Sequence, residues 1–186
     1  MRFYSIVIPV YNRPEEINEL LESLTKQTFT NFEVVVVEDG SKDLAEQIVA
    51  SFKDRLTIKY FYKENTGQGL TRNFAYERAS GDYFIVFDSD CLIPPHYLQA
   101  VEDRLNTDYL DAFGGPDRVD ASFTPVQKAI SYSMTSLFTT GGIRGNKKGV
   151  GVFHPRSFNM GISKEVWLRT KGYIITRKGE DIEFSI

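Results

Sequence analysis

Two aspartates, Asp88 and Asp90 with Ser89 between them, directly follow an apolar segment of the chain. In an extended backbone, side chains two positions apart point to the same side, so both carboxylates can reach one ligand. Carboxylate oxygens are hard ligands that suit Mg²⁺ or Mn²⁺, and these ions in turn bind phosphate oxygens. The simpler alternative is a strand that ends in acidic turn residues, since Asp and Ser favour turns. The apolar segment before the pair and Pro94-Pro95 after it favour the metal site.

A second acidic cluster, Glu38-Asp39-Gly40-Ser41, follows another apolar segment at residues 32–37. A pair of carboxylates at a buried strand end is costly unless it meets a partner. The N–H groups of a nucleobase or the hydroxyls of a ribose are suitable partners. In the alternative interpretation, Asp39 only shapes the turn between a strand and a helix. Ser41 is predicted to be the N-cap of that helix.

Two more positions carry residue types that suit a nucleotide. Tyr11 follows the first apolar segment and can stack on a nucleobase, and the alternative is an ordinary half-buried tyrosine. Gly67 and Gly69 open a predicted helix, which lets backbone N–H groups approach an anion. Arg72 lies in the first turn of that helix, where the helix dipole favours acids. Taken by itself, Arg72 is explained equally well as an exposed, solvated arginine.

Alternating strands and helices position these clusters. Apolar, β-branched segments predict strands at residues 4–10, 32–38, 57–62 and 83–87. Helical spacing and capping residues predict helices at residues 14–24, 41–52, 67–79 and 98–105, the third with Leu70, Phe74 and Ala75 facing the core. This order is typical of an α/β fold with a Rossmann-like, mostly parallel sheet and helices on both faces. Ligands of such sheets bind beyond the carboxyl ends of the strands, so the polar clusters are predicted to converge on one edge.

The pattern is less regular after Leu110. A short strand ends at Gly114-Gly115, and a long glycine-rich stretch follows. A strand is predicted at residues 158–163 and a short helix at 165–170. The last residues, 180–186, are typical of the first turns of a helix, so we expect the chain to be a fragment of a longer protein.

Length and composition exclude several classes of protein. The chain has 186 residues, and 22 Lys and Arg stand against 25 Asp and Glu, giving a net charge of −3. That balance argues against a nucleic-acid binder. The single cysteine, Cys91, excludes an intramolecular disulfide. No apolar run approaches the ~18 residues that a transmembrane segment needs, so a cytoplasmic protein is expected.

Taken together, several motifs resemble those of the family 2 glycosyltransferases, which have the GT-A fold. The resemblance covers residue 4 to about residue 181, in the expected order. Its main pieces are Pro9-Val10-Tyr11-Asn12-Arg13, Glu38-Asp39-Gly40-Ser41, Asn65-Thr66-Gly67, Arg72-Asn73, Asp88-Ser89-Asp90 and Gly179-Glu180-Asp181. The resemblance implies transfer of a sugar from a nucleotide-activated donor, often a UDP-sugar, to an acceptor hydroxyl with inversion. It also implies a divalent Mn²⁺ or Mg²⁺, a carbohydrate or lipid-linked glycan acceptor, and a part in the synthesis of cell-surface polysaccharides or glycoconjugates.

The resemblance implies a role for individual residues. Tyr11 packs on the base and Asp39 hydrogen-bonds it, while Arg72 lies near the base or the diphosphate. Asp88 holds the ribose or the sugar and shares the metal with Asp90, and Asp181 is the general base. Pro9, Glu38 and Ser89 complete the nucleotide-binding set. The family often has Asp where this chain has Glu38, whose side chain is one methylene longer.

The resemblance also implies how the chain is divided. Residues 1–186 form one catalytic domain, with residues 1–113 as its nucleotide-binding half and residues 114–186 as part of its acceptor-binding half. Family members continue further, and contact with the inner face of the membrane is expected through that missing C-terminal part.

Two other functions are compatible with parts of the sequence. A catalytically silent module that binds a nucleotide-sugar or a glycan fits a shortened chain, but the presence of Asp88, Asp90 and Asp181 argues against it. A Mg²⁺-dependent phosphatase with an aspartate nucleophile usually carries its acidic motif on the first strand. Here the first strand ends in Tyr11-Asn12-Arg13, which argues against that function.

Overall fold

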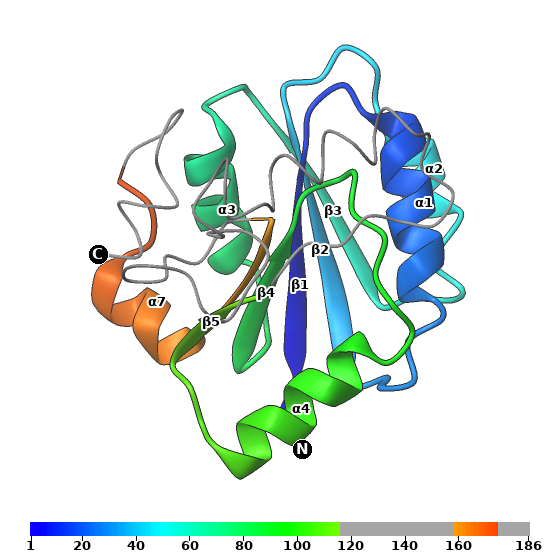
Figure 1. The fold of residues 1–186 in the computed structure, drawn as a ribbon. Helices are drawn as coiled ribbons and strands as arrows, with labels where there is room; N and C mark the ends of the chain where they lie inside the picture. Colours follow the sequence, from blue (N-terminus) through cyan, green and yellow to red (C-terminus); the bar gives the residue numbers. More distant parts are fainter. Residues whose placement is uncertain (116–157, 175–186) are drawn as a thin grey trace, which may run out of the picture.

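The computed structural model describes residues 1–115 and 158–174, and these form one sheet with helices packed on both of its faces (Figure 1). The sheet has six strands in the order β3-β2-β1-β4-β6-β5. The strands are β1 (Tyr4–Val10), β2 (Phe32–Asp39), β3 (Ile58–Lys63), β4 (Tyr83–Phe87), β5 (Ala112–Gly114) and β6 (Asn159–Ser163). The helices are α1 (Pro14–Leu24), α2 (Glu46–Ala50), α3 (Gln68–Tyr76), α4 (Tyr97–Thr107) and α7 (Lys164–Thr170).

The first four strands are parallel, and the last two run antiparallel to their neighbours. β1 pairs with β2 and β4, and β2 pairs with β3, all in parallel. β6 pairs antiparallel with both β4 and β5. Every residue of β2 and β4 is buried, as expected for central strands with helices on both faces. The predicted α/β fold with a mostly parallel sheet is therefore confirmed.

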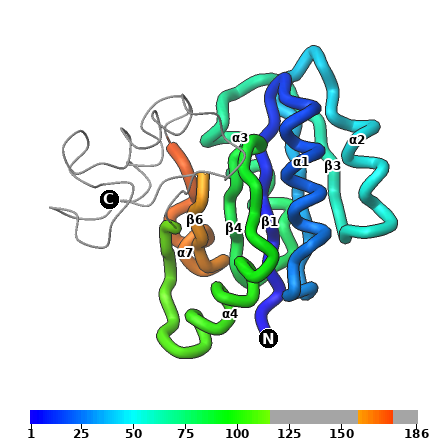
Figure 2. Tube along the Cα trace, turned by 45° about the vertical axis from the view of Figure 1, so that its right-hand side comes forward, coloured from blue at the N-terminus to red at the C-terminus, as the bar shows by residue number. Residues whose placement is uncertain are grey.

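Alternating side chains of the strands build two apolar cores. On one face Ile6 and Val34 join a cluster with residues of α1, α2 and α4. On the other face Val7 and Val35 pack with residues of α3 and α7. Figure 2 shows α1 and α2 on one side of the sheet and α3 and α7 on the other. With period-two alternation, adjacent residues at a strand's end point to opposite faces.

Two helices differ from the sequence prediction. α2 begins at Glu46, and Ser41 does not cap it; the Ser41 hydroxyl instead accepts a hydrogen bond from the backbone N–H of Asn12 at 2.8 Å. α3 ends at Tyr76 rather than at residue 79, and Leu70 is exposed rather than inward. Gly69, Thr71, Arg72, Ala75 and Tyr76 are the residues of α3 that are buried. Of the expected inward stripe, Ala75 is buried and Phe74 packs against the core, so the prediction was wrong for Leu70 alone.

The sheet contains strands from both expected halves of the domain, residues 1–113 and residues 114–186. β6 belongs to the part assigned to the acceptor, yet it lies between β4 and β5 and hydrogen-bonds to both. The glycine-rich stretch and the expected final helix, with Glu180 and Asp181, lie outside the described residues. Among the residues that are described, none of the helices is long and apolar enough to cross a membrane.

Candidate functional site

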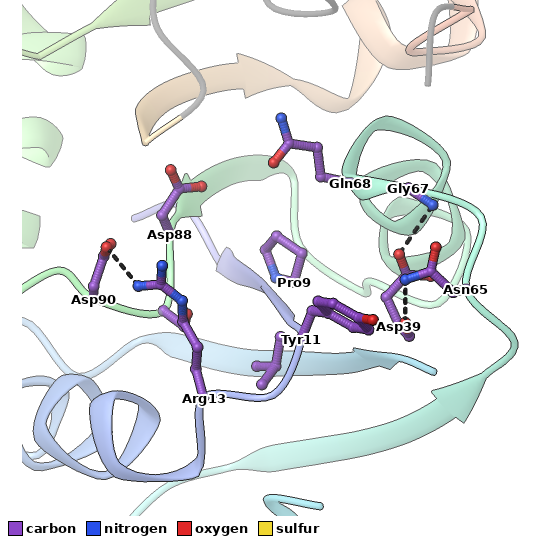
Figure 3. A pocket seen from close by; sticks show the side chains of 11 residues that line it. Pro9, Tyr11, Arg13, Asp39, Asn65, Gly67, Gln68, Asp88 and Asp90 are labelled. Carbon is purple, nitrogen blue, oxygen red and sulfur yellow. Dashed lines mark hydrogen bonds and ion pairs between the residues drawn. The ribbon is translucent and has the colours of Figure 1, made fainter. Parts of the chain in front are cut away.

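A pocket of about 550 Å³ opens at the carboxyl ends of β1, β2 and β4 (Figure 3). Parallel strands β2, β1 and β4 lie side by side there, and the chain reverses its direction of winding between β1 and β4. Such a switch point is where ligands of open α/β sheets bind. The pocket is lined by Pro9, Val10, Tyr11, Arg13, Asp39, Asn65, Gly67, Gln68, Asp88, Ser89 and Asp90.

The end of β1 supplies an exposed aromatic ring. Tyr11 is 54% exposed and lines the pocket, and its ring is of the kind that stacks on a planar ligand. Next to it, Asn12 has a φ of 51°, a left-handed conformation that asparagine tolerates better than most residues. The Oδ1 of Asn12 accepts a hydrogen bond from the backbone N–H of Lys42 at 2.7 Å. This bond ties the turn after β1 to the loop after β2, so Tyr11 projects from a fixed turn.

The end of β2 places Asp39 against the start of α3. Its two carboxylate oxygens accept hydrogen bonds from the backbone N–H groups of Thr66 and Gly67, each at 3.0 Å. Lys63 at the end of β3 forms an ion pair with the same carboxylate. Burial alone would raise the pKa of Asp39, but the hydrogen bonds from Lys63 and Thr66 outweigh it and lower that pKa overall. Asp39 therefore lines the pocket as a buried, ionised side chain, and most of its hydrogen bonds are to residues of the protein.

Glycine is required where this loop turns. Gly67 has a φ of 90°, and its N–H points to Asp39 as α3 begins. Gly40 has a φ of 74°, and a Cβ there would lie 2.7 Å from the backbone nitrogen of Asn65. The Asn65 side chain donates to the backbone carbonyl of Asp39 at 2.8 Å. These contacts bring the segment before α3 to the pocket's edge.

Glu38 lies behind the pocket rather than in its lining. Its side chain is fully buried and faces α2, on the opposite side of the sheet from Asp39. Its Oε2 accepts hydrogen bonds from the backbone N–H of Ala45 and from the Tyr60 hydroxyl, both at 2.9 Å. The structure thus places the predicted nucleotide contact of Glu38 out of reach of this pocket, because adjacent strand residues point to opposite faces.

The end of β4 supplies the two aspartates of the opposite wall. Figure 3 shows Asp88 and Asp90 on one side of the pocket, with Asp39, Asn65 and Gly67 on the other. Asp88 Oδ1 lies 3.1 Å from a guanidinium nitrogen of Arg72, and Asp90 Oδ2 lies 2.9 Å from one of Arg13. Ser89 between them is buried but still borders the pocket.

Arg72 is fully buried, so the interpretation as an exposed, solvated arginine is wrong. Its guanidinium lies over the ring of Tyr173, 5.4 Å from the centroid, and reaches Asp88 from behind the pocket lining. The next residue, Asn73, bonds the backbone of Tyr173 twice: its Oδ1 accepts from the N–H at 2.9 Å and its Nδ2 donates to the carbonyl at 2.8 Å. These contacts join α3 to the segment after α7 and hold Arg72 in place beneath Asp88.

A divalent cation bound with a nucleotide fits the donor set on β4. No three acidic, histidine or cysteine side chains come together as a metal cluster among the described residues. Mg²⁺ at nucleotide sites, however, uses only one or two carboxylates and completes its shell with phosphate oxygens and water. Asp88 and Asp90 are both partly exposed and both line the pocket. They can therefore hold such a cation together with a diphosphate.

The pocket brings together most of the predicted site. Pro9, Tyr11, Asp39, Asp88, Ser89 and Asp90 line it, whereas Glu38 and Arg72 lie behind it and Asp181 is outside the described residues. Sequence reasoning did not assign a role to Arg13, Lys63 or Gln68. Arg13 follows β1 and Lys63 ends β3, so both lie at the sheet edge where the acidic residues were expected. That position in the sequence could have indicated that they belong to the site.

Comparison with known sequences identifies the family. The model of Glycosyl transferase family 2 matches residues 5–167. An uncharacterized glycosyltransferase of Rickettsia conorii is 32% identical over 187 residues, covering 91% of this chain and 30% of that protein. The poly(ribitol-phosphate) beta-N-acetylglucosaminyltransferase TarS of Staphylococcus aureus is 43% identical over 103 residues, covering 53% of this chain and 18% of TarS. The chain thus spans less than a third of the length of these two relatives.

Comparison with solved structures gives the same result. The crystal structure of S. aureus TarS 1–349 in complex with UDP-GlcNAc matches with a TM-score of 0.75 at 26% identity, covering 98% of this chain and 52% of that one. A mannosyltransferase from Pyrobaculum calidifontis, solved with GDP-Man and Mn²⁺, shares the fold with a TM-score of 0.73 at 18% identity. The match covers 98% of this chain and 50% of the mannosyltransferase chain. The sheet order, the pocket at the strand ends and both comparisons agree: the fold is GT-A, and the chain belongs to glycosyltransferase family 2.

Proposed function

We propose that this chain binds a nucleoside diphosphate sugar, a UDP-sugar first of all, and serves transfer of the sugar to an acceptor hydroxyl. The observation that carries the proposal is the pocket itself, with an exposed tyrosine and a buried aspartate at one end and two aspartates at the other. These groups suit a base at one end and a metal-bound diphosphate at the other. TarS, a relative in both sequence and fold, has been solved with UDP and with UDP-GlcNAc.

The proposed donor lies across the pocket from Tyr11 to Asp90. Tyr11 stacks on the base, and Asp39 holds the base edge together with the loop that carries Gly67. Asp88 and Asp90 hold a Mn²⁺ or Mg²⁺ ion, which when bound neutralises charge on the departing diphosphate. Arg72 fixes Asp88 from behind, and Glu38 supports the loop after β2 without touching the donor.

The proposed reaction inverts the sugar's anomeric configuration. Inversion needs an in-line attack, with a carboxylate removing the acceptor's proton on the face opposite the diphosphate. Asp181 is the proposed base, and it lies beyond the residues that the family model matches. A carbohydrate or lipid-linked glycan is the proposed acceptor, in the cytoplasm or at the inner face of the membrane.

Transfer activity in the whole protein tests this proposal. Asp181→Asn preserves the side chain's shape but removes the proton acceptor, so sugar transfer is expected to fall by about 10²–10⁴-fold. Binding of UDP with Mn²⁺, measured by calorimetry on the same variant, is expected to stay at the wild-type value. Release of UDP from a panel of UDP-sugars, with a glycan acceptor present, is the transfer assay.

Three outcomes separate the alternatives. Undiminished transfer by Asp181→Asn would place the base elsewhere, and Glu180→Gln is the next variant to assay. Binding of a UDP-sugar without transfer or hydrolysis in the wild-type protein would instead identify a silent binding module. A phospho-aspartate adduct would identify a phosphatase.

A further inference from the structure

The pocket's three carboxylates each face one basic side chain, and the three ion pairs differ in how firmly they are held. Lys63, which pairs with Asp39, and Arg72, which pairs with Asp88, are both largely or fully buried. Arg13, which pairs with Asp90, is 47% exposed, and Asp90 is 55% exposed. Only the Arg13–Asp90 pair is exposed on both sides, and exposed ion pairs are weak enough to exchange partners.

The position of Arg13 allows its guanidinium to leave Asp90 and remain at the pocket. Arg13 is itself part of the pocket lining, between β1 and α1 (Figure 3). Its guanidinium is 2.9 Å from Asp90 and 3.9 Å from Glu16, one turn along α1. An arginine released from Asp90 thus stays near a second carboxylate and still faces the cavity. A guanidinium in that place is well suited to bind phosphate oxygens.

A divalent cation and a guanidinium cannot both occupy the same carboxylate oxygens of Asp90 without strong mutual repulsion. Arg13 contacts Oδ2 of Asp90, so a cation that binds this carboxylate competes with Arg13 and weakens the ion pair. A diphosphate makes this exchange favourable, because it offers anionic oxygens to the cation and to the arginine at once. A cation arriving alone leaves Arg13 only Glu16, which lies 3.9 Å from its guanidinium already.

Accordingly, we propose that Arg13 is a positioning residue that holds Asp90 until the donor arrives and then passes from Asp90 to the donor's diphosphate. Resting on the proposed function, this assignment adds that binding of the metal and binding of the diphosphate are coupled through Arg13. Coupling of this kind is reciprocal: the diphosphate strengthens metal binding by the same factor as the metal strengthens diphosphate binding.

Binding of Mn²⁺, followed by the electron paramagnetic resonance signal of the free ion, tests the exchange without any activity assay. In the absence of nucleotide, Arg13→Gln is expected to bind Mn²⁺ about two- to fivefold more tightly than the wild type, the factor an exposed ion pair is worth. Arg13→Lys, which keeps the charge, is expected to resemble the wild type. Melting temperatures confirm that each variant is folded.

Arg55→Gln is the matched control. Arg55 is 48% exposed and pairs with Glu22 at 2.8 Å, away from the pocket, so the substitution makes the same change in net charge. It is expected to leave Mn²⁺ binding unchanged. Addition of Asp90→Asn to Arg13→Gln is expected to abolish the gain, because the gain depends on that carboxylate.

The same titrations with UDP and with uridine measure the coupling, after subtraction of Mn²⁺ bound by UDP alone. UDP is expected to strengthen Mn²⁺ binding by a larger factor in the wild type than in Arg13→Gln. Uridine, which lacks phosphates, is expected to leave Mn²⁺ binding unchanged in both proteins. Equal Mn²⁺ affinity in the wild type and Arg13→Gln without nucleotide would overturn the role of Arg13 while leaving the proposed function standing. Absence of Mn²⁺ binding by the wild type even with UDP would overturn the metal part of the proposed function as well.

Discussion

The carboxylate of Asp39 joins three parts of the molecule: the end of β2, Lys63 at the end of β3, and the turn at Gly67 that begins α3. It is at the same time a wall of the pocket. Its substitution is therefore expected to affect both stability and nucleotide binding. An aspartate that only shaped the turn would affect stability alone.

Asp39→Asn is predicted to lower the free energy of unfolding by about 3 kcal/mol, because Lys63 loses its ion-pair partner and one N–H of the loop loses its acceptor. UDP binding is predicted to weaken by about 1–3 kcal/mol, the usual cost of leaving a buried polar group unpaired. Chemical denaturation and calorimetry measure the two effects.

Glu33→Gln is the matched control for this variant. Glu33 is a buried carboxylate at the opposite end of β2, and Lys59 Nζ lies 2.8 Å from its Oε2. It is predicted to cost similar stability with no change in UDP affinity. Should Asp39→Asn behave in the same way as Glu33→Gln, Asp39 has no part in binding.

The lowered pKa of Asp39 makes part of the stability pH-dependent. The carboxyl's ordinary pKa is 3.8, and folding lowers it, so the stabilisation is complete above that value and is lost as the pH falls through the folded-state pKa. In Asp39→Asn, the acid side of the stability profile is accordingly expected to be flatter than in the wild type.

At the scale of elements, the last two residues of β2 connect the strand to different helices. Asp39 faces the start of α3. Glu38 faces the loop before α2, where it accepts from the N–H of Ala45, and it also accepts from the hydroxyl of Tyr60 on β3. Strand periodicity alone separates them, one to each face of the sheet. Only Asp39 reaches the pocket.

Glu38→Ala is predicted to lower the free energy of unfolding by about 2 kcal/mol, because two donors lose their acceptor, while UDP affinity stays at the wild-type value. Tyr60→Phe removes one of the two hydrogen bonds and is predicted to cost less. Denaturation and UDP calorimetry on both variants measure this. Weaker UDP binding by Glu38→Ala with unchanged stability would restore the nucleotide contact expected from the family resemblance.

Strands and helices were predictable where the pattern of apolar residues determines their bounds. β1 and β4 begin and end at the expected residues. β4 is an uninterrupted apolar run between Asp82 and Asp88, and β1 is rich in apolar, β-branched residues. The caps and inner faces of short helices were less predictable. The Ser41 hydroxyl accepts from the backbone of Asn12 rather than capping α2, because the loops after β1 and β2 hydrogen-bond to each other. Leu70 is exposed because Gly69, Thr71 and Arg72 occupy the buried face of α3.

Over the whole molecule, the convergence of polar strand ends was predictable, because it follows from parallel order alone. The partners of those acids were not. Two places were open for Arg72, an exposed, solvated one and one near the base or the diphosphate. Among the described residues it is the largest fully buried side chain, in contact with Asp88 and with Tyr173, a residue 101 positions later in the sequence. Contacts between such distant positions depend on how α3 and the segment after α7 pack, which one sequence does not reveal.

Asp90, at the end of β4, is proposed to bind a divalent cation together with a nucleoside diphosphate. Calorimetry of UDP with and without Mn²⁺ tests it in the wild type, in Asp90→Asn and in Asp108→Asn. Asp108 is the control, since it is 56% exposed and paired with Arg104 at 2.7 Å, much as Asp90 is paired with Arg13.

Mn²⁺ is predicted to strengthen UDP binding to the wild type and to Asp108→Asn. In Asp90→Asn that metal-dependent gain is predicted to be lost, because the cation loses a fixed oxygen ligand. A gain in UDP affinity with Mn²⁺ that is as large in Asp90→Asn as in the wild type would show that Asp90 does not hold the cation. The absence of any effect of Mn²⁺ on UDP binding to the wild type would show that no cation binds with the nucleotide.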